Sequence, residues 1–146
     1  MDTYDRRCQL GASRRMRDDA VALHNQKRWT GAIYLGGYAI ECALKSLICY
    51  EERKNNFKDT KCFQKVQGAS LHHLTILLNE LIIIQRSILL DRSGIYKTAW
   101  NLVSLVWRND ELRYSNKLGD EKDSEKFIEA VQVLHTFFLA KQDESS

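Results

Sequence analysis

The sequence contains no proline and only seven glycines in 146 residues. Proline breaks helices more strongly than any other residue, so its absence removes the commonest cause of an interrupted helix. Leucine, isoleucine, alanine, lysine and glutamate are plentiful, and no segment has the alternating period of a strand. We therefore expect an all-α fold. The length is that of one domain with a sizeable core, so we expect residues 1–146 to form a single helical domain.

The chain also lacks a C-x-x-C pair, an H-E-x-x-H motif and an N-terminal signal peptide. We therefore expect no metal site, no cofactor and a reduced, cytoplasmic chain. Cys62, His72 and His73 are the nearest approach to a ligand set, but their spacing is not that of a zinc site. The longest apolar stretch, Leu74–Leu90, is interrupted by charged and amide side chains, so no membrane span is expected.

Strong charge of either sign is lacking too. The formal net charge of +3 is too small to imply nucleic-acid binding by itself. Its distribution is uneven, since residues 1–28 carry seven Lys/Arg against four Asp/Glu, and residues 110–146 carry five against nine. We interpret this asymmetry as solvated helix faces.

Apolar residues recur with the helical period in five segments. The helices are expected from Ser13, as N-cap, to about residue 27, from residue 31 to about 53, from Ser70 to about 90, over residues 96–107, and from Asp123 or Ser124 onward. Residues 54–69 lose this period and are expected to form a long polar loop. The predicted architecture is an up-and-down bundle of four to five helices, with that loop between the second and the third.

The stretch YLGGYAIECALK, residues 34–45, is apolar nearly all round but carries one polar stripe. Tyr38, Glu41 and Lys45 lie on one face of the helix. A helix of this kind is the central, buried element of a bundle. Because an unpaired buried charge is too costly to keep, Glu41 needs a partner.

The stretch WRNDELRYS, residues 107–115, offers such a partner. Arg113 follows an apolar anchor, and a forked guanidinium matches a carboxylate well. We expect Glu41 to hydrogen-bond to Arg113 or Arg108, with Tyr38 or Tyr114 in the same network.

Lys45 is the competing partner of Glu41, but a glutamate–lysine pair on one helix contributes only about 0.2–0.5 kcal/mol. The network has two interpretations, which the sequence leaves open. Either it only fixes the geometry of a loop, or it forms a site for a ligand or an RNA phosphate.

These segments together resemble the HEPN domain family (higher-eukaryote and prokaryote nucleotide-binding). The resemblance lies in the order of Trp29, Ala32, Tyr34, Leu35, Tyr38, Ala39, Glu41, Leu44 and Lys45, then His73–Leu74, then Arg113–Tyr114. It implies a four- or five-helix bundle that is often dimeric. It also implies a role in toxin–antitoxin, antiphage-defence or RNA-processing systems, frequently beside a nucleotidyltransferase-type partner.

Catalytic members of that family are metal-independent ribonucleases with an Arg-x(4–6)-His motif. Arg108 and Asn109 begin such a motif here, but the expected histidine positions hold Arg113, Tyr114 and Ser115. Arginine does not exchange protons near neutral pH, and an ordinary tyrosine has a pKa near 10.

The resemblance therefore implies a degenerate member that acts by binding RNA or a protein partner. The alternatives are a metal-independent ribonuclease toxin that uses Arg108 and Asn109, and a structural dimeric adaptor.

The remaining histidines suggest no catalytic pair. Arg17 and His24 have the literal Arg-x(6)-His spacing, but they lie on the first helix, where a surface arginine and a half-buried histidine are expected. His135 stands among apolar residues and is expected to be packed. We also expect a homodimer, because Trp100 and Trp107 are seven residues apart and aromatic side chains concentrate at interface cores.

Overall fold

The structure is a computed structural model that describes residues 2–66, 68–107 and 120–142. Within these residues it contains seven α-helices, two short 3-10 helices and no strand, which confirms the expected all-α class. The α-helices are α1 (Arg6–Asn25), α2 (Trp29–Glu52), α3 (Lys61–Lys65), α4 (Leu74–Asn79), α5 (Ile82–Leu89), α6 (Ile95–Val106) and α8 (Glu121–Ala140). The 3-10 helices are η1 (Phe57–Asp59) and η2 (Gly68–His72).

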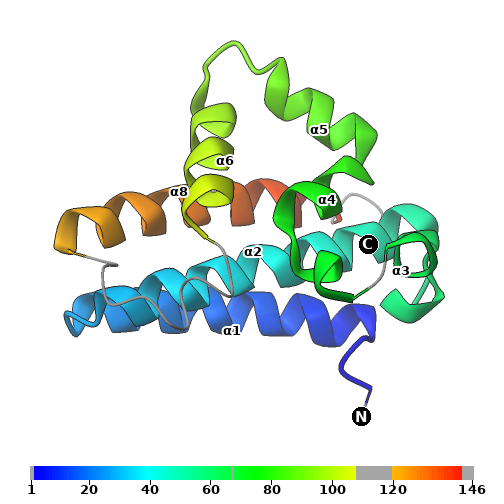
Figure 1. Ribbon diagram of the computed structural model, residues 1–146, viewed down its shortest axis with the longest axis horizontal. Coiled ribbons are helices and arrows are strands. Elements are labelled where there is room, and N and C mark those ends of the chain that lie inside the picture. The colour runs from blue at the N-terminus through cyan, green and yellow to red at the C-terminus, as the bar shows by residue number, and fades with distance from the viewer. Residues whose placement is uncertain (1, 67, 108–119, 143–146) are drawn as a thin grey trace.

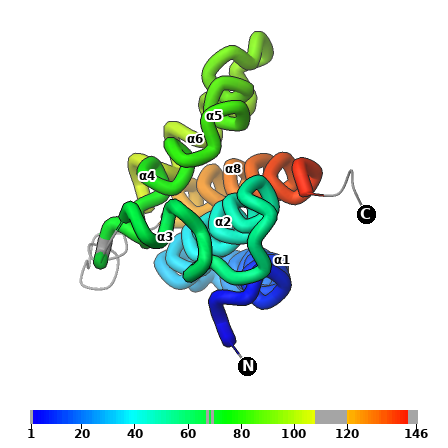
Figure 2. The backbone as a smooth tube through the Cα atoms, turned by 90° about the vertical axis from the view of Figure 1, so that its right-hand side faces the viewer, coloured from blue at the N-terminus to red at the C-terminus, as the bar shows by residue number. Residues whose placement is uncertain are grey.

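The three long helices lie lengthwise beside one another. Figure 1 shows α2 between α1 and α8, with α1 running in the opposite direction to the other two. The shorter helices α4 and α6 cover part of this layer, and Tyr96 at the start of α6 packs on Phe137 of α8. Helix α5 and the turn that joins it to α6 project away from the layer, as Figure 2 also shows. The long helices thus form a base, and α5 with α6 forms an arm.

The core is built around α2, and every residue from Ala39 to Cys49 is buried. Side chains of α4, α6 and α8 pack against it, including Leu77, Val103 and Phe127. By length and hydropathy α2 also resembles a membrane span, but 83% of that window is buried inside the protein, as in the core helix of a bundle. The sequence-based expectation of a central, buried second helix is confirmed.

Two helix starts differ from the sequence-based expectation. Helix α1 begins at Arg6, not at Ser13, because the Asp5 carboxylate accepts hydrogen bonds from the backbone amides of Arg7 and Cys8. Helix α8 is capped by Asp120, whose side chain accepts from the amide of Asp123. In both cases the cap is an aspartate upstream of the expected residue.

The expected third helix, over residues 70–90, is in fact three elements. η2 ends at His72, α4 follows to Asn79, and α5 begins at Ile82. The break between α4 and α5 leaves Leu81 buried while Ile82 and Ile83 are exposed, and Gln85 donates a side-chain hydrogen bond to Asn79 across it. The expected loop over residues 54–69 likewise contains η1 and α3, because Asn56 and Thr60 cap these short helices.

Trp100 and Trp107 are core residues, so they cannot form the interface that suggested a homodimer. Their relative exposures are 7% and 3%. The Trp107 indole lies directly on the backbone of α2, where its Nε1 donates to the carbonyl oxygen of Tyr34 at 3.1 Å. The homodimer itself stays a prediction.

The contact between Trp107 and α2 depends on Gly37. A Cβ atom at Gly37 would lie 1.9 Å from Cδ1 of Trp107. Because the indole is buried and hydrogen-bonded, we expect Gly37→Ala to lower the free energy of unfolding by about 1–3 kcal/mol or more through overpacking, measured by urea denaturation.

Gly11→Ala is the matched control, since its nearest new contact is the flexible end of Arg15 at 3.4 Å. Alanine is the better helix former, so this variant should be as stable as the parent or slightly more stable. Equal stability of the two variants would contradict the packing described here.

Candidate functional site

A buried ion pair lies at the middle of α2. Lys45 Nζ is 2.9 Å from Glu41 Oε2, and both side chains are only 4% exposed. The ammonium also lies 5.5 Å from the ring centroid of Phe57 and 6.0 Å from that of Tyr4. The electron-rich faces of these rings compensate part of the desolvation of the charge.

His72, at the end of η2, connects this pair to the surface. Its Nδ1 is 2.9 Å from the same Glu41 oxygen, and its side chain is 45% exposed. A carboxylate only accepts hydrogen bonds, so Nδ1–H is the donor, and in the neutral imidazole Nε2 is left as an acceptor. The bond therefore fixes both the tautomer and the ring orientation.

One oxygen of this site lacks a partner within the part of the chain that the structure describes. Oε1 of Glu41 is buried and accepts no hydrogen bond from the residues that the structure describes. A buried carboxylate oxygen in this state is costly, so it is a ready acceptor for a water molecule or another donor. The arrangement thus holds a half-exposed imidazole in a fixed orientation against a buried carboxylate.

The expected partners of Glu41 cannot be placed. Arg108, Asn109, Arg113 and Tyr114 all lie outside the described residues. Within the described residues, Glu41 bonds to Lys45 and His72.

Lys45, which the sequence analysis names as the competing partner of Glu41, does form the pair. The preference for an arginine used a value for exposed helix pairs, whereas this pair is buried, and that preference stays a prediction. Tyr38 contacts Tyr34 through its hydroxyl at 3.3 Å and packs against Trp107 at 5.3 Å between ring centroids.

Arg17 and His24 do not form a pair. Arg17 forms an ion pair with Asp18 and donates to Nδ1 of His135 at 3.2 Å. His24 lies 2.7 Å from Oγ of Ser124 and packs against the Trp29 ring. Each side chain thus joins α1 to another helix, and neither faces the other.

His135 is packed, as expected from the sequence, but it is also hydrogen-bonded at both ring nitrogens. Its Nε2 lies 3.0 Å from Oγ of Ser13, whose hydroxyl donates to the carbonyl of Leu10. Burial, together with the positive charges of Arg17 and Arg14, lowers the pKa of His135 to about 4, and the nearby Asp18 opposes this only in part. The imidazole is therefore neutral at pH 7.

Three of the four cysteines have the environment of an unreactive thiol. All four are free, and Cys42, Cys49 and Cys62 are buried. Burial raises the pKa of the first two to about 12 and that of Cys62 to about 11, so these thiols stay protonated. No group of three potential metal ligands occurs among the described residues.

The comparison with protein families identifies a domain in this chain. The model of the AAA+ lid domain matches residues 58–145, which is more than half of the chain. This chain belongs to the AAA+ lid domain family. No curated protein and no solved structure matches it.

The resemblance to HEPN domains is therefore wrong, and the toxin–antitoxin, defence and ribonuclease functions that it implied are wrong with it. Most of the residues that carried it lie on α2. Ala32, Ala39 and Leu44 are all buried there, so their spacing reflects what any closely packed central helix requires.

The lid-domain match begins within η1, so the Glu41 site lies across its boundary. His72 falls inside the matched residues, whereas Glu41 and Lys45 fall before them. The site therefore joins the lid-domain part of the chain to the helix on which that part packs. This contact could not be predicted from the sequence, because His72 follows a segment without clear periodicity.

Removing one member of the buried pair should be far more harmful than removing both. Glu41→Ala leaves the Lys45 ammonium buried and unpaired, so we expect a loss of roughly 3–5 kcal/mol in the free energy of unfolding. The double variant Glu41→Met with Lys45→Met should recover most of that loss, because it buries no charge. His72→Ala should cost less than Glu41→Ala, since His72 is half-exposed.

Urea denaturation of these variants measures each effect, and a double-mutant cycle gives the coupling between Glu41 and Lys45. Additive single effects would contradict the buried pair.

The buried His135 predicts a pH-dependent stability. Its pKa in the folded chain, about 4, is below the ordinary value of about 6.5 in the unfolded chain. The stabilisation from the neutral imidazole is therefore complete above about pH 6.5 and is lost as the pH falls toward 4. This adds a slope of up to about 1.4 kcal/mol per pH unit.

The measurement is the urea midpoint at several pH values between 4 and 7, for the parent and for His135→Gln. The variant keeps every other titrating group, so it should show a shallower decline. Parallel curves would contradict the assignment.

Proposed function

We propose that this chain acts as the helical lid of an AAA+ ATPase, by docking on the ATP-hydrolysing core of that enzyme. The core can be on the same polypeptide or on another one. In this proposal the chemistry of ATP belongs to the core, and the contribution of this chain is binding and movement. The observation that carries it is the family match over residues 58–145, which includes the whole projecting arm.

The arm offers a surface for such docking. The large apolar residues that are exposed in the described part of the chain all lie between residues 82 and 105, and they are Ile82, Ile83, Leu89, Leu90, Ile95 and Leu105. Exposed apolar clusters of this kind mark interaction sites. Four of the six belong to α5 or follow it directly, so we assign the outer face of α5 to the ATPase core.

The base of the molecule supports this arm. Ile84 and Ile88, on the inner face of α5, belong to the same core as α2 and α8. The sequence analysis predicts an up-and-down bundle of four to five helices, and we retain that arrangement as part of the proposal. A bundle of this kind would keep the base rigid when the ATPase core binds to the arm. A base of this kind would transmit force between the core and the rest of the chain.

Two exposed residues of the arm provide the test. Ile83 and Leu90 are 78% and 77% exposed, so Ile83→Asp with Leu90→Asp removes apolar contact area without disturbing the fold. We expect the double variant to bind the purified AAA+ core from the same source at least about ten-fold more weakly, equivalent to about 1.4 kcal/mol. Calorimetry measures the affinity, and the ATPase rate of the core reports the functional effect.

The matched control is Gln132→Asp, which adds a charge at an exposed position of α8 and should leave binding unchanged. An intact chain that neither binds any AAA+ core of its source nor alters an ATPase rate would overturn the proposal. Undiminished binding by the double variant would move the docking surface away from α5.

A further inference from the structure

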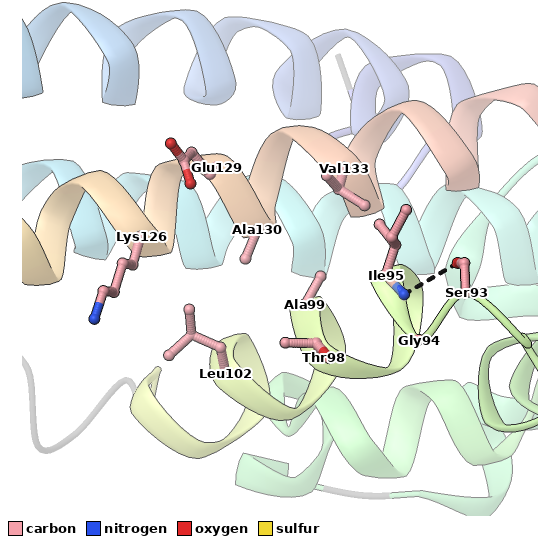
Figure 3. A pocket seen from close by; sticks show the side chains of 10 residues that line it. All are labelled: Ser93, Gly94, Ile95, Thr98, Ala99, Leu102, Lys126, Glu129, Ala130 and Val133. Carbon is pink, nitrogen blue, oxygen red and sulfur yellow. Dashed lines mark hydrogen bonds between the residues drawn. The ribbon is translucent and has the colours of Figure 1, made fainter.

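A hollow of about 450 Å³ lies between α6 and α8, at the foot of the arm. Figure 3 shows that Thr98 and Leu102 reach it from α6, while Lys126, Glu129 and Val133 lie along it on α8. Its floor is formed by small side chains, Ala99 and Ala130. The hollow is therefore mainly apolar, with two charged residues on the α8 side.

The side of α6 that faces this hollow is mainly apolar even where it is exposed, with Thr98 as its polar residue. Ile95, Leu102 and Leu105 share one flank of the helix with Thr98, at spacings of three, four and seven residues. Ile95 and Leu105 are 56% and 70% exposed. The neighbouring flank carries the exposed Lys97 and Asn101 and the half-buried Ser104 instead. Such a one-sided apolar stripe beside a hollow is what a packing helix requires.

The two charges on α8 show which helix would fit. Lys126 and Glu129 are exposed, lie one turn apart and have no ion-pair partner among the described residues. In a two-fold symmetric interface, a contact between residues i and j occurs twice. A two-fold axis that passes between these two positions would place Lys126 of each copy beside Glu129 of the other. The pattern is therefore complementary to itself.

We propose that this hollow is the interface for a second copy of the chain, related by a two-fold axis that passes between Lys126 and Glu129. The apolar flanks of α6 would then cover each other, and each lysine would gain a carboxylate partner across the interface. The interface is independent of the docking on an ATPase core, which uses the outer face of α5. It also replaces the two tryptophans as the physical basis for a dimer.

Sedimentation equilibrium of the whole chain, from low to high micromolar concentration, tests the proposal. We expect a reversible dimer. Lys126→Glu places carboxylates opposite each other, and Glu129→Lys places ammonium groups opposite each other, so each single variant should weaken the dimer at least ten-fold.

The double variant Lys126→Glu with Glu129→Lys should restore the dimer, because each reversed residue again faces its complement. Restoration is specific to this geometry, since two independent surface effects would add.

Leu105→Asp should also weaken the dimer, whereas Ile83→Asp on α5 is the control that should not. Thermal melting of each variant shows that the fold is retained. A monomer at high micromolar concentration overturns the proposal. It does so even if a helix of another protein proves to bind in the hollow. A dimer that the double charge reversal fails to restore also overturns it.

Discussion

The burial of α2 on every side constrains the rest of the molecule. From Ala39 to Cys49 the helix has no exposed residue, so α1, α8 and the shorter helices must each cover one of its faces. Small residues set how closely they approach, as Gly37 does for Trp107. A charge in such a helix persists only with its own partners, and among the described residues these are Lys45 and His72 for Glu41.

The same constraint explains how much of the fold could be predicted. The second helix was predicted well because its apolar residues are continuous, and the all-α class followed from a chain without proline. The third helix was predicted as one element because periodicity cannot show a break without glycine or proline, and the break at Leu81 depends on tertiary packing. Two helix starts were predicted too late in the chain, because several residues near each start are able to cap a helix. The caps in the structure are Asp5 and Asp120.

Less of the candidate site than of the fold could be predicted from the sequence. That Glu41 is buried and paired could be predicted from the sequence, since the surrounding pattern leaves no route to water. That His72 is one of its partners could not, because His72 reaches Glu41 from 31 residues away, through a segment that carries no period. The predicted partners Arg108 and Arg113 lie outside the described residues. The family resemblance failed for a related reason. Residues that any central helix needs for packing were interpreted as a signature of function, whereas the residues that show the family begin where that helix ends.

Three of the four cysteines are buried in this core, whereas the fourth is partly accessible to solvent. Cys42, Cys49 and Cys62 are closed off from solvent and keep their protons, while Cys8 on α1 is only half-buried. A thiol reagent should therefore find Cys8 first and reach the others only when helices separate from α2. The rate at which the buried thiols react would therefore report how often helices separate from α2. A faster rate when a partner is bound to the arm would show that this binding loosens the base.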